Sequence, residues 1–277
     1  MQASDLKITF IGAGNMATAI IGGLISKGFD NTNILVSAPS NKNLLPLKEK
    51  YSVATTNNNN NAVVDSNVII LSVKPQMMKN VCEPLAAHIN KNALIISVAA
   101  GITCDTLKQW LNDDFPIIRC MPNTPAQIQE GVSGLFANSL VQKHHKNTAE
   151  EILGAVGITQ WVEDESLINS IIAVAGSAPA YFFLFIEAMI EAAIEQGLSA
   201  EDATRMATQT AYGSAKLALS TGENIKQLRH KVTSPNGTTE QAILSFENNG
   251  LRQIVREAMS ACSKRAKEIE LQSSELK

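Results

Sequence analysis

Two glycines near the start of the chain have the spacing of a phosphate-binding turn. Gly12, Gly14 and Ala17 follow a short apolar segment and precede a helical stretch. Gly12 permits a tight turn, Gly14 lets the backbone approach phosphates without a Cβ, and Ala17 lets the helix lie against the strand. The helix N-terminus adds amide donors. The turn therefore predicts a bound nicotinamide or flavin dinucleotide. The alternative is a glycine-rich turn that binds nothing.

The end of the second predicted strand favours NADP(H), with NAD(H) as the alternative. NAD-specific folds place an acidic residue there, on the ribose 2′-hydroxyl. No carboxylate occurs here before Glu49. Hydroxyls, amides and one positive charge suit a 2′-phosphate instead, although each is also ordinary turn chemistry. They come from Ser37, Ser40, Asn41 and Lys42.

Three later loops follow strand-like runs and are rich in proline or glycine. They are Val73–Gln76, Ala99–Gly101 and Met121–Pro125. The carboxyl ends of parallel strands form the rim where ligands bind in open α/β sheets. One such loop is explained as a turn, but three in succession predict a site for the nicotinamide and a substrate.

A second candidate anion site lies in the C-terminal half. Ser234–Thr239 is a Ser-Pro-Asn-Gly-Thr-Thr turn that enters a helical stretch. Free amides and hydroxyls at a helix N-terminus suit a small carboxylate. From the turn alone, a well-capped helix is the slightly better interpretation.

The elements that position these motifs alternate between strand and helix in the first half. Apolar β-rich runs occur at 34–37, 68–73, 93–98 and 115–119, with helical patterns at 41–50, 76–88 and 103–111. This alternation predicts a parallel sheet with right-handed crossovers. Strands at 132–136 and 158–162, with a helix from about 148 to 156 between them, extend its far edge.

After residue 163 the strand pattern stops and alanine-rich helical segments take over. They span 167–175, 179–196, 200–220, 225–231, 239–248 and 251–270. The predicted fold class is therefore α/β, with a Rossmann-type dinucleotide domain at 1–163 followed by an all-helical dimerisation and substrate domain at 164–277.

The segment Ile171–Ile186 is the most apolar part of the chain. Gly176, Ser177 and Pro179 interrupt it, so we expect a buried helix that is too short to span a membrane. The helix from Pro179 is apolar around most of its circumference and needs cover on all sides. A second copy of the chain is the expected cover, which predicts a homodimer.

Composition excludes several classes of protein. The 277 residues carry a formal net charge of −3, without a basic stripe, so nucleic acid is not an expected partner. The four cysteines are scattered, which argues against zinc and disulfides and fits a reducing cytoplasm. The N-terminus leads straight into the first strand, leaving no room for a signal peptide.

Two local features receive structural interpretations. Asn57–Asn61 is five consecutive asparagines, expected in a surface loop near the cofactor edge. His144 and His145 point to different sides of a helix start, so no metal site is expected there.

Taken together, the motifs closely resemble the pyrroline-5-carboxylate reductases, which perform the last step of proline synthesis. The resemblance covers the whole chain. Its motifs are Ile11–Met16, Val73–Pro75, Ala99–Gly101, Met121–Pro125, Gly176–Tyr181 and Ser234–Thr239. The last two are the most specific, because other dinucleotide reductases share only the first.

The resemblance implies NAD(P)H-dependent reduction of (S)-1-pyrroline-5-carboxylate to L-proline. It also implies a dimer with interwoven helical domains, often assembled into rings of dimers. The candidate cofactor positions, from the motifs and the resemblance together, are Ile11, Gly12, Ala13, Gly14, Asn15, Met16, Ser37, Ser40, Asn59, Ser72, Val73, Lys74, Pro75, Ala99, Ala100, Gly101, Pro122 and Asn123. The implied substrate positions are Glu165, Val232, Ser234, Pro235, Asn236, Gly237, Thr238 and Thr239, with Thr239 beside the substrate nitrogen.

Two positions depart from the family pattern. Ala178 stands where the family often has glycine, and Asn236 where glycine is usual. Asparagine tolerates positive φ better than most residues, so the turn is expected to survive. The changes bear on substrate affinity more than on reaction type.

The loops contain no histidine, which argues against a histidine proton relay. We expect catalysis by positioning and electrostatics, with the Thr239 hydroxyl on the ring nitrogen and the proton from water or substrate. Two alternative functions stay open. One is the reduction of a related cyclic imine such as piperideine-2-carboxylate, and the other is that of a β-hydroxyacid dehydrogenase. The latter class uses a lysine in the first long helix after the sheet, and Val174–Tyr181 has none. A remote third alternative is a non-catalytic NADPH sensor.

Overall fold

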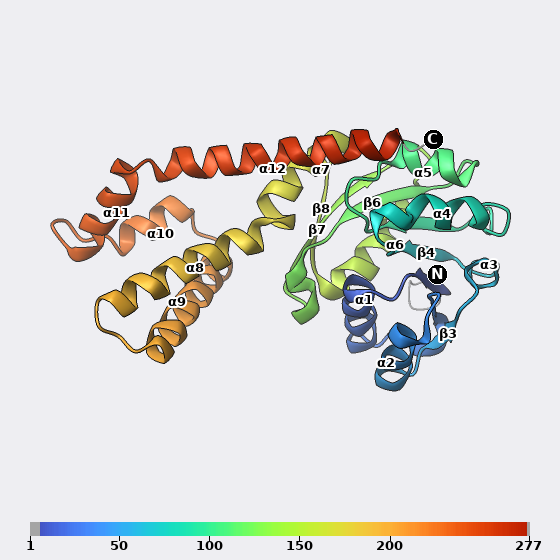
Figure 1. Cartoon of the computed structure of the whole chain (residues 1–277), viewed down its shortest axis with the longest axis horizontal. Coiled ribbons are helices and arrows are strands. Elements are labelled where there is room, and N and C mark those ends of the chain that lie inside the picture. The colour runs from blue at the N-terminus through green and yellow to red at the C-terminus, as the bar shows by residue number, and fades with distance from the viewer. Residues whose placement is uncertain (1–5, 276–277) are drawn as a thin grey trace. The chain divides into compact units, whose positions relative to one another are not determined.

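An eight-stranded sheet forms the centre of the N-terminal half in the computed structural model, which describes residues 6–275 (Figure 1). The strand order is β3-β2-β1-β4-β5-β6-β7-β8. The strands are β1 Ile8–Ile11, β2 Ile34–Ser37, β3 Ala54–Thr56, β4 Val68–Leu71, β5 Leu94–Ser97, β6 Ile117–Met121, β7 Gly131–Ala137 and β8 Gly157–Trp161. Every residue of β1, β4 and β5 is buried, as expected of parallel strands covered on both faces.

The strand order reverses at β1. Ile11 at its end lies opposite Ser37 of β2 on one side and Leu71 of β4 on the other. In open α/β sheets this switch point is where a crevice opens for a ligand. The fold therefore places the glycine turn after β1 at the position that binds dinucleotides.

Side chains of successive residues in a strand pack alternately into two separate hydrophobic cores. Phe10, Ile70 and Ile96 belong to one core, shared with helices α1 Asn15–Ser26, α2 Asn41–Tyr51 and α6 Lys143–Leu153. Ile69 and Ile95 belong to the other, shared with α4 Pro75–Leu85 and α5 Cys104–Leu111. This alternation follows from the two-residue period of a strand. The predicted α/β architecture is confirmed.

One strand pair departs from the predicted parallel sheet, because β7 runs antiparallel to β6. The connection between them covers only residues 122–130 and contains one short 3₁₀ turn, Thr124–Ile128. A parallel return needs a crossover of about a dozen residues or more, so this connection only allows a reversal. β8 then pairs parallel to β7, with α6 in the crossover.

Helix α6 begins earlier than the predicted residue 148. Gln142 and His145 form a capping box in which the His145 Nδ1 accepts a hydrogen bond from the Gln142 amide at 3.2 Å. The cap satisfies amides that a helix start would otherwise leave free. Burial, followed by the charge of His144, lowers the pKa of His145. The histidine pair thus sits at a helix start, as expected.

The C-terminal half is helical. Its elements are α7 Ile168–Ile171, a π turn Ile172–Gly176, α8 Ala178–Glu195, α9 Ala200–Thr221, α10 Ile225–Lys231, α11 Thr238–Asn248 and α12 Leu251–Ser274. By compactness, the described residues up to Ser177 group with those from Cys262 onward, while Ala178–Ala261 form a second unit. The first unit thus includes the end of α12. The boundary after residue 163 stays a prediction, because compactness and sequence pattern define a domain differently.

One expectation for the apolar segment was wrong, namely that it is too short to span a membrane. Helical structure continues from Glu165 to Glu195, a run of 31 residues that contains an 18-residue stretch with a mean hydropathy of 1.7, and it is long and apolar enough by length and composition to cross a membrane. Pro179 does not break it, since it is the second residue of α8, where proline is tolerated. The helix is also not buried by its own chain: Phe182, Phe183 and Leu184 are each about two-thirds exposed.

Candidate active site

The turn after β1 is held so tightly that only glycine fits at its first position. Gly12 has a φ of 108°, and a Cβ there would lie 2.7 Å from the Ser72 carbonyl oxygen. The Ser72 amide donates to the Ile11 carbonyl at 2.9 Å, and its hydroxyl donates to the Gly12 carbonyl at 3.0 Å. The Gly12 amide donates to the Ser37 carbonyl at 2.8 Å. Strands β2 and β4 therefore fix the turn between them.

The next residues leave an open helix end. Gly14 is the N-cap of α1, makes no side-chain cap hydrogen bond, and a Cβ on it would meet nothing within 4 Å. The first turn of α1 contains no acidic residue. Exposed amides at a positive helix end, with clear space before them, fit the pyrophosphate of a dinucleotide. The predicted residues Ala13, Asn15 and Met16 are all at least partly exposed here.

The edge predicted to hold the adenosine, called the adenosine edge, is built partly from the asparagine run. The prediction of a surface loop was wrong for part of it, because Asn59–Ala62 form the short helix α3, capped by Asn58. The Ser37 hydroxyl donates to the Asn59 Oδ1 at 2.6 Å. This bond joins two predicted cofactor residues that are 22 positions apart in the sequence. Strand β3, which pairs with β2, was not predicted from the sequence and brings the run to this edge.

A second helix N-terminus faces the same edge. Ser40 is the N-cap of α2, and its hydroxyl accepts a hydrogen bond from the Lys42 amide at 3.2 Å. The first turn of α2 contains no acidic residue, and Lys42 is exposed. A helix start with a nearby ammonium group favours an anion over a neutral hydroxyl.

The three rim loops follow β4, β5 and β6 as predicted, and each is anchored differently. Lys74 is an exposed N-cap and Pro75 begins α4, the position where proline is best tolerated. Gly101 has a φ of 73° and is buried. Asn123 is buried, donates to the Ala175 carbonyl at 3.1 Å and accepts from the Val132 amide at 2.9 Å. The Asn123 side chain therefore holds its loop in place, and Pro122 beside it is buried.

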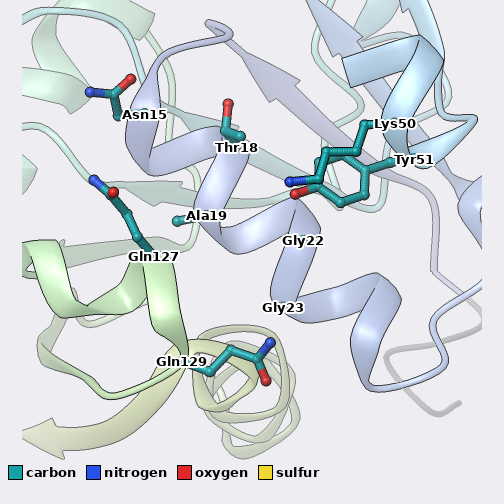
Figure 2. A pocket seen from close by; sticks show the side chains of 9 residues that line it. All are labelled: Asn15, Thr18, Ala19, Gly22, Gly23, Lys50, Tyr51, Gln127 and Gln129. Carbon is teal, nitrogen blue, oxygen red and sulfur yellow. The ribbon is translucent and has the colours of Figure 1, made fainter. Parts of the chain in front are cut away.

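A polar groove of about 450 Å³ runs along the flank of α1 (Figure 2). Its lining residues are Asn15, Thr18, Ala19, Gly22, Gly23, Lys50, Tyr51, Gln127 and Gln129. Gly22 allows the Tyr51 side chain to come close, since a Cβ there would lie 2.7 Å from its hydroxyl. Only Asn15 among the predicted cofactor residues lines this groove, so the predicted cofactor surface lies at the strand ends instead.

The second anion site is a helix start without a side-chain cap. Gly237 is the N-cap of α11 and makes no such bond, so the alternative of a well-capped helix would rest on the Glu240 side chain instead. Asn236 has a φ of 59°, and its amide donates to the Glu240 carboxylate at 2.7 Å. The Gly237 amide donates to the Ser234 carbonyl at 3.0 Å. The turn is thereby shaped from within, while Thr238 and Thr239 stay exposed.

Glu165 lies in a different environment from the other predicted substrate residues. Its Oε1 accepts hydrogen bonds from the Cys104 amide at 2.9 Å and from the Arg119 guanidinium at 3.2 Å. Glu165 belongs to the compact unit that contains the sheet, whereas Val232 and Ser234–Thr239 belong to the other unit. Its contact with substrate stays a prediction. What the structure shows is an ion pair with Arg119.

Sequence reasoning missed Arg119 itself, although a signal was present. Arg119 interrupts the apolar strand β6, and its side chain is 2 % exposed. A charge in a buried strand needs a buried partner, so an acidic residue had to be found for it elsewhere. It has two, Glu165 and Glu270.

The buried cysteines offer no nucleophile. Burial raises the pKa of Cys82 and of Cys120 to about 12, and burial also raises the pKa of Cys104, aided by Glu165. A thiol is nucleophilic only as a thiolate, so these three are inert near neutral pH.

Comparison with known proteins agrees with this geometry. Residues 7–101 match a family model described as NADP oxidoreductase, coenzyme F420-dependent, and residues 165–269 match one described as pyrroline-5-carboxylate reductase dimerisation. The pyrroline-5-carboxylate reductase of Pseudomonas aeruginosa is 46% identical over 266 residues, covering 96% of this chain and 97% of that protein. The chain belongs to the pyrroline-5-carboxylate reductase family.

Further members of the family show how far the likeness extends. The Escherichia coli reductase is 37% identical and covers 96% of this chain and 98% of its own length. The structure of the Coxiella burnetii reductase superimposes with a TM-score of 0.92 at 45% identity, covering 95% of this chain and 98% of that one. The structure of the Plasmodium falciparum pyrroline carboxylate reductase, which has NADP bound, superimposes with a TM-score of 0.85 at 26% identity. The match covers 96% of this chain and 99% of that one. The predicted family is confirmed.

Proposed function

We propose that this chain reduces (S)-1-pyrroline-5-carboxylate to L-proline with a reduced nicotinamide dinucleotide. The observation that carries the proposal is the pair of helix starts free of side-chain caps, one after the glycine turn and one after Ser234–Asn236, in a member of this family. The first is suited to a pyrophosphate and the second to a small carboxylate.

One assay separates this function from its alternatives. Oxidation of NADPH is followed by the loss of its near-ultraviolet absorbance, with pyrroline-5-carboxylate, piperideine-2-carboxylate or a 3-hydroxy acid as the second substrate. Turnover with pyrroline-5-carboxylate supports the proposal. Turnover only with a 3-hydroxy acid would identify a β-hydroxyacid dehydrogenase, and tight NADPH binding with no turnover would identify a sensor.

The roles of the chain's own residues follow from the substrate, a cyclic imine that bears a carboxylate. The amides of Thr238 and Thr239 hold the carboxylate, because they are the first amides of α11, whereas the Gly237 amide donates to the Ser234 carbonyl. The Thr239 hydroxyl bonds the ring nitrogen, which favours the protonated iminium. Water or the substrate itself brings the proton. The bound nicotinamide supplies the hydride, so the protein contributes position and electrostatics.

The cofactor preference is proposed to be NADPH over NADH. A carboxylate at the end of β2 would repel a 2′-phosphate, and Ser37 stands there instead. The start of α2 then offers the Ser40 hydroxyl, Asn41 and the exposed Lys42. The Ser37 hydroxyl bonds Asn59, which supports the proposal that this side chain contacts the ribose. Steady-state kinetics with both nucleotides test the preference.

The assembly is proposed to be a homodimer, further arranged in rings of dimers, in the cytoplasm. The dimerisation match covers α8, whose exposed apolar face includes Phe182, Phe183, Leu184 and Phe185. Such a face needs cover. We propose that a second copy provides it rather than lipid. Light scattering after size exclusion in detergent-free buffer tests this, since a monomer, or a protein that requires detergent, contradicts it.

A further inference from the structure

Arg119 is the centre of a buried charge cluster, and the mechanism proposed above gives Arg119 itself no role. Its Nη1 lies 3.2 Å from the Glu165 Oε1, and its Nη2 lies 2.5 Å from the Glu270 Oε1. The Glu270 Oε2 accepts a further hydrogen bond from the Asn169 side-chain amide at 2.9 Å. The carboxylates are 22 % and 16 % exposed. Charged hydrogen bonds in such surroundings are strong and directional.

The cluster ties together segments that are distant in sequence. Arg119 lies in β6, two residues before Met121 and the rim loop that contains Asn123. Glu165 also accepts from the amide of Cys104, the first residue of α5, which follows the rim loop Ala99–Gly101. One guanidinium therefore fixes the two rim loops predicted to border the nicotinamide.

The end of α12 closes the same region from outside. Glu270 comes from this helix, and one turn before it Ala266 is buried. A Cβ added to Gly101 would collide with the Ile269 side chain, so the helix lies directly against the second rim loop. Nearer its middle, the Cys262 thiol bonds the Ser177 hydroxyl at 3.3 Å.

We propose that Arg119 is a positioning residue for hydride transfer, and that the last turns of α12, held by Glu270, belong to the scaffold of the cofactor rim. The inference rests on the proposed function. Loss of Glu270 leaves Arg119 paired with Glu165, so the buried positive charge keeps a partner and the fold survives. The rim loops lose their outer support, and small displacements at a reacting centre are costly to rate.

The first test compares two glutamates of the same helix. Glu270→Ala lowers kcat/KM with NADPH and pyrroline-5-carboxylate about tenfold or more, and Glu270→Gln lowers it less because the amide keeps the shape. Glu268→Ala is the matched control, since Glu268 pairs with Arg265 at an exposed position, and it leaves kcat/KM within about twofold. Equal kcat/KM in Glu270→Ala and Glu268→Ala overturns the proposal.

The second readout separates positioning from general loosening. The probe is 2′-phosphoadenosine diphosphoribose, which lacks the nicotinamide and occupies only the edge built from Gly12–Met16 and Ser37–Lys42. Its Kd in Glu270→Ala stays within about twofold of the parent protein, because those residues lie away from the cluster. A fall in its affinity as large as the fall in kcat/KM overturns the positioning role.

Amide hydrogen exchange keeps the two proposals distinguishable. Glu270→Ala speeds exchange at residues 99–104 and 119–123, and Glu268→Ala does not. If the parent protein shows no turnover with pyrroline-5-carboxylate, the proposed function fails while this measurement still decides the scaffold. Unchanged exchange at both rim loops overturns the scaffold even in an active enzyme.

Discussion

Two helix starts of the chain are the proposed anion sites, and they are built in opposite ways. The start of α1 is fixed by the sheet: Gly12 is buried, bonded to Ser37 and in contact with Ser72. The start of α11 is shaped by its own turn, through Ser234, Asn236 and Glu240, and its threonines are exposed. A turn fixed by the sheet tolerates no change of residue, whereas a turn shaped locally tolerates substitution and is open to tuning. Asn236, a residue other than glycine with a φ of 59°, illustrates this.

The largest expected effect is at Gly12. Gly12→Ala places a methyl group 2.7 Å from the Ser72 carbonyl at a φ of 108°, so we expect stability to fall by ~2–4 kcal/mol and NADPH binding to be lost. Thermal unfolding and nucleotide titration measure both. Gly14→Ala is the control, because its Cβ meets nothing within 4 Å. It should keep its melting temperature and lose only phosphate affinity. Equal melting temperatures for the two variants would show that the sheet does not restrict the turn.

The next effect concerns the hydroxyl at the start of α11. Thr239→Ala should remove ~1–3 kcal/mol of transition-state stabilisation, the usual cost of losing a hydrogen bond to a charged group. This loss corresponds to a fall in kcat/KM of about 5- to 150-fold. Thr239→Ser keeps the hydroxyl and should recover most of the activity. Steady-state kinetics decide, and an unchanged kcat/KM in Thr239→Ala removes this hydroxyl from the mechanism.

A smaller effect is expected at the adenosine edge. Lys42→Ala should raise the KM for NADPH about fivefold, leave the KM for NADH unchanged and weaken the salt dependence of NADPH binding, because one exposed charge is removed from the 2′-phosphate. Lys48→Ala, at the opposite end of α2, is the control. An equal rise in KM for both nucleotides would mean that Lys42 does not contact the 2′-phosphate.

The smallest effect tests the tolerance of the second turn. Asn236→Gly should change stability by less than about 1 kcal/mol, since glycine also adopts the observed φ of 59°. Asn236→Ala should cost about 1 kcal/mol, because alanine is disfavoured there. Chemical denaturation measures both. A loss in Asn236→Gly as large as that in Gly12→Ala would remove the contrast between the two helix starts.

The sequence was sufficient for features whose cause is local. Continuous apolar runs predicted β4 and β5, and the glycine spacing predicted the turn at Gly12 and Gly14, because hydrophobic period and backbone sterics act over a few residues. The helix starts at Ala200, Ile225 and Leu251 were predicted to the residue for the same reason.

What the sequence did not predict depends on distant partners. β3 has only three residues and exists through its pairing with β2. The helix at Asn59 lies in a run whose composition favours a loop, yet its first residue bonds Ser37. The partners of Arg119 lie 46 and 151 residues away. No periodicity encodes such separations, so tertiary contacts override local preference.

The exposed phenylalanines of α8 have a consequence for how the protein is made. If a second copy covers this helix as proposed, each newly made chain exposes it until another chain binds, so maturation would follow second-order kinetics and slow at low chain concentration. At low expression the monomer would be the species most susceptible to degradation or aggregation. Supply of active enzyme would then rise more steeply than the rate of synthesis.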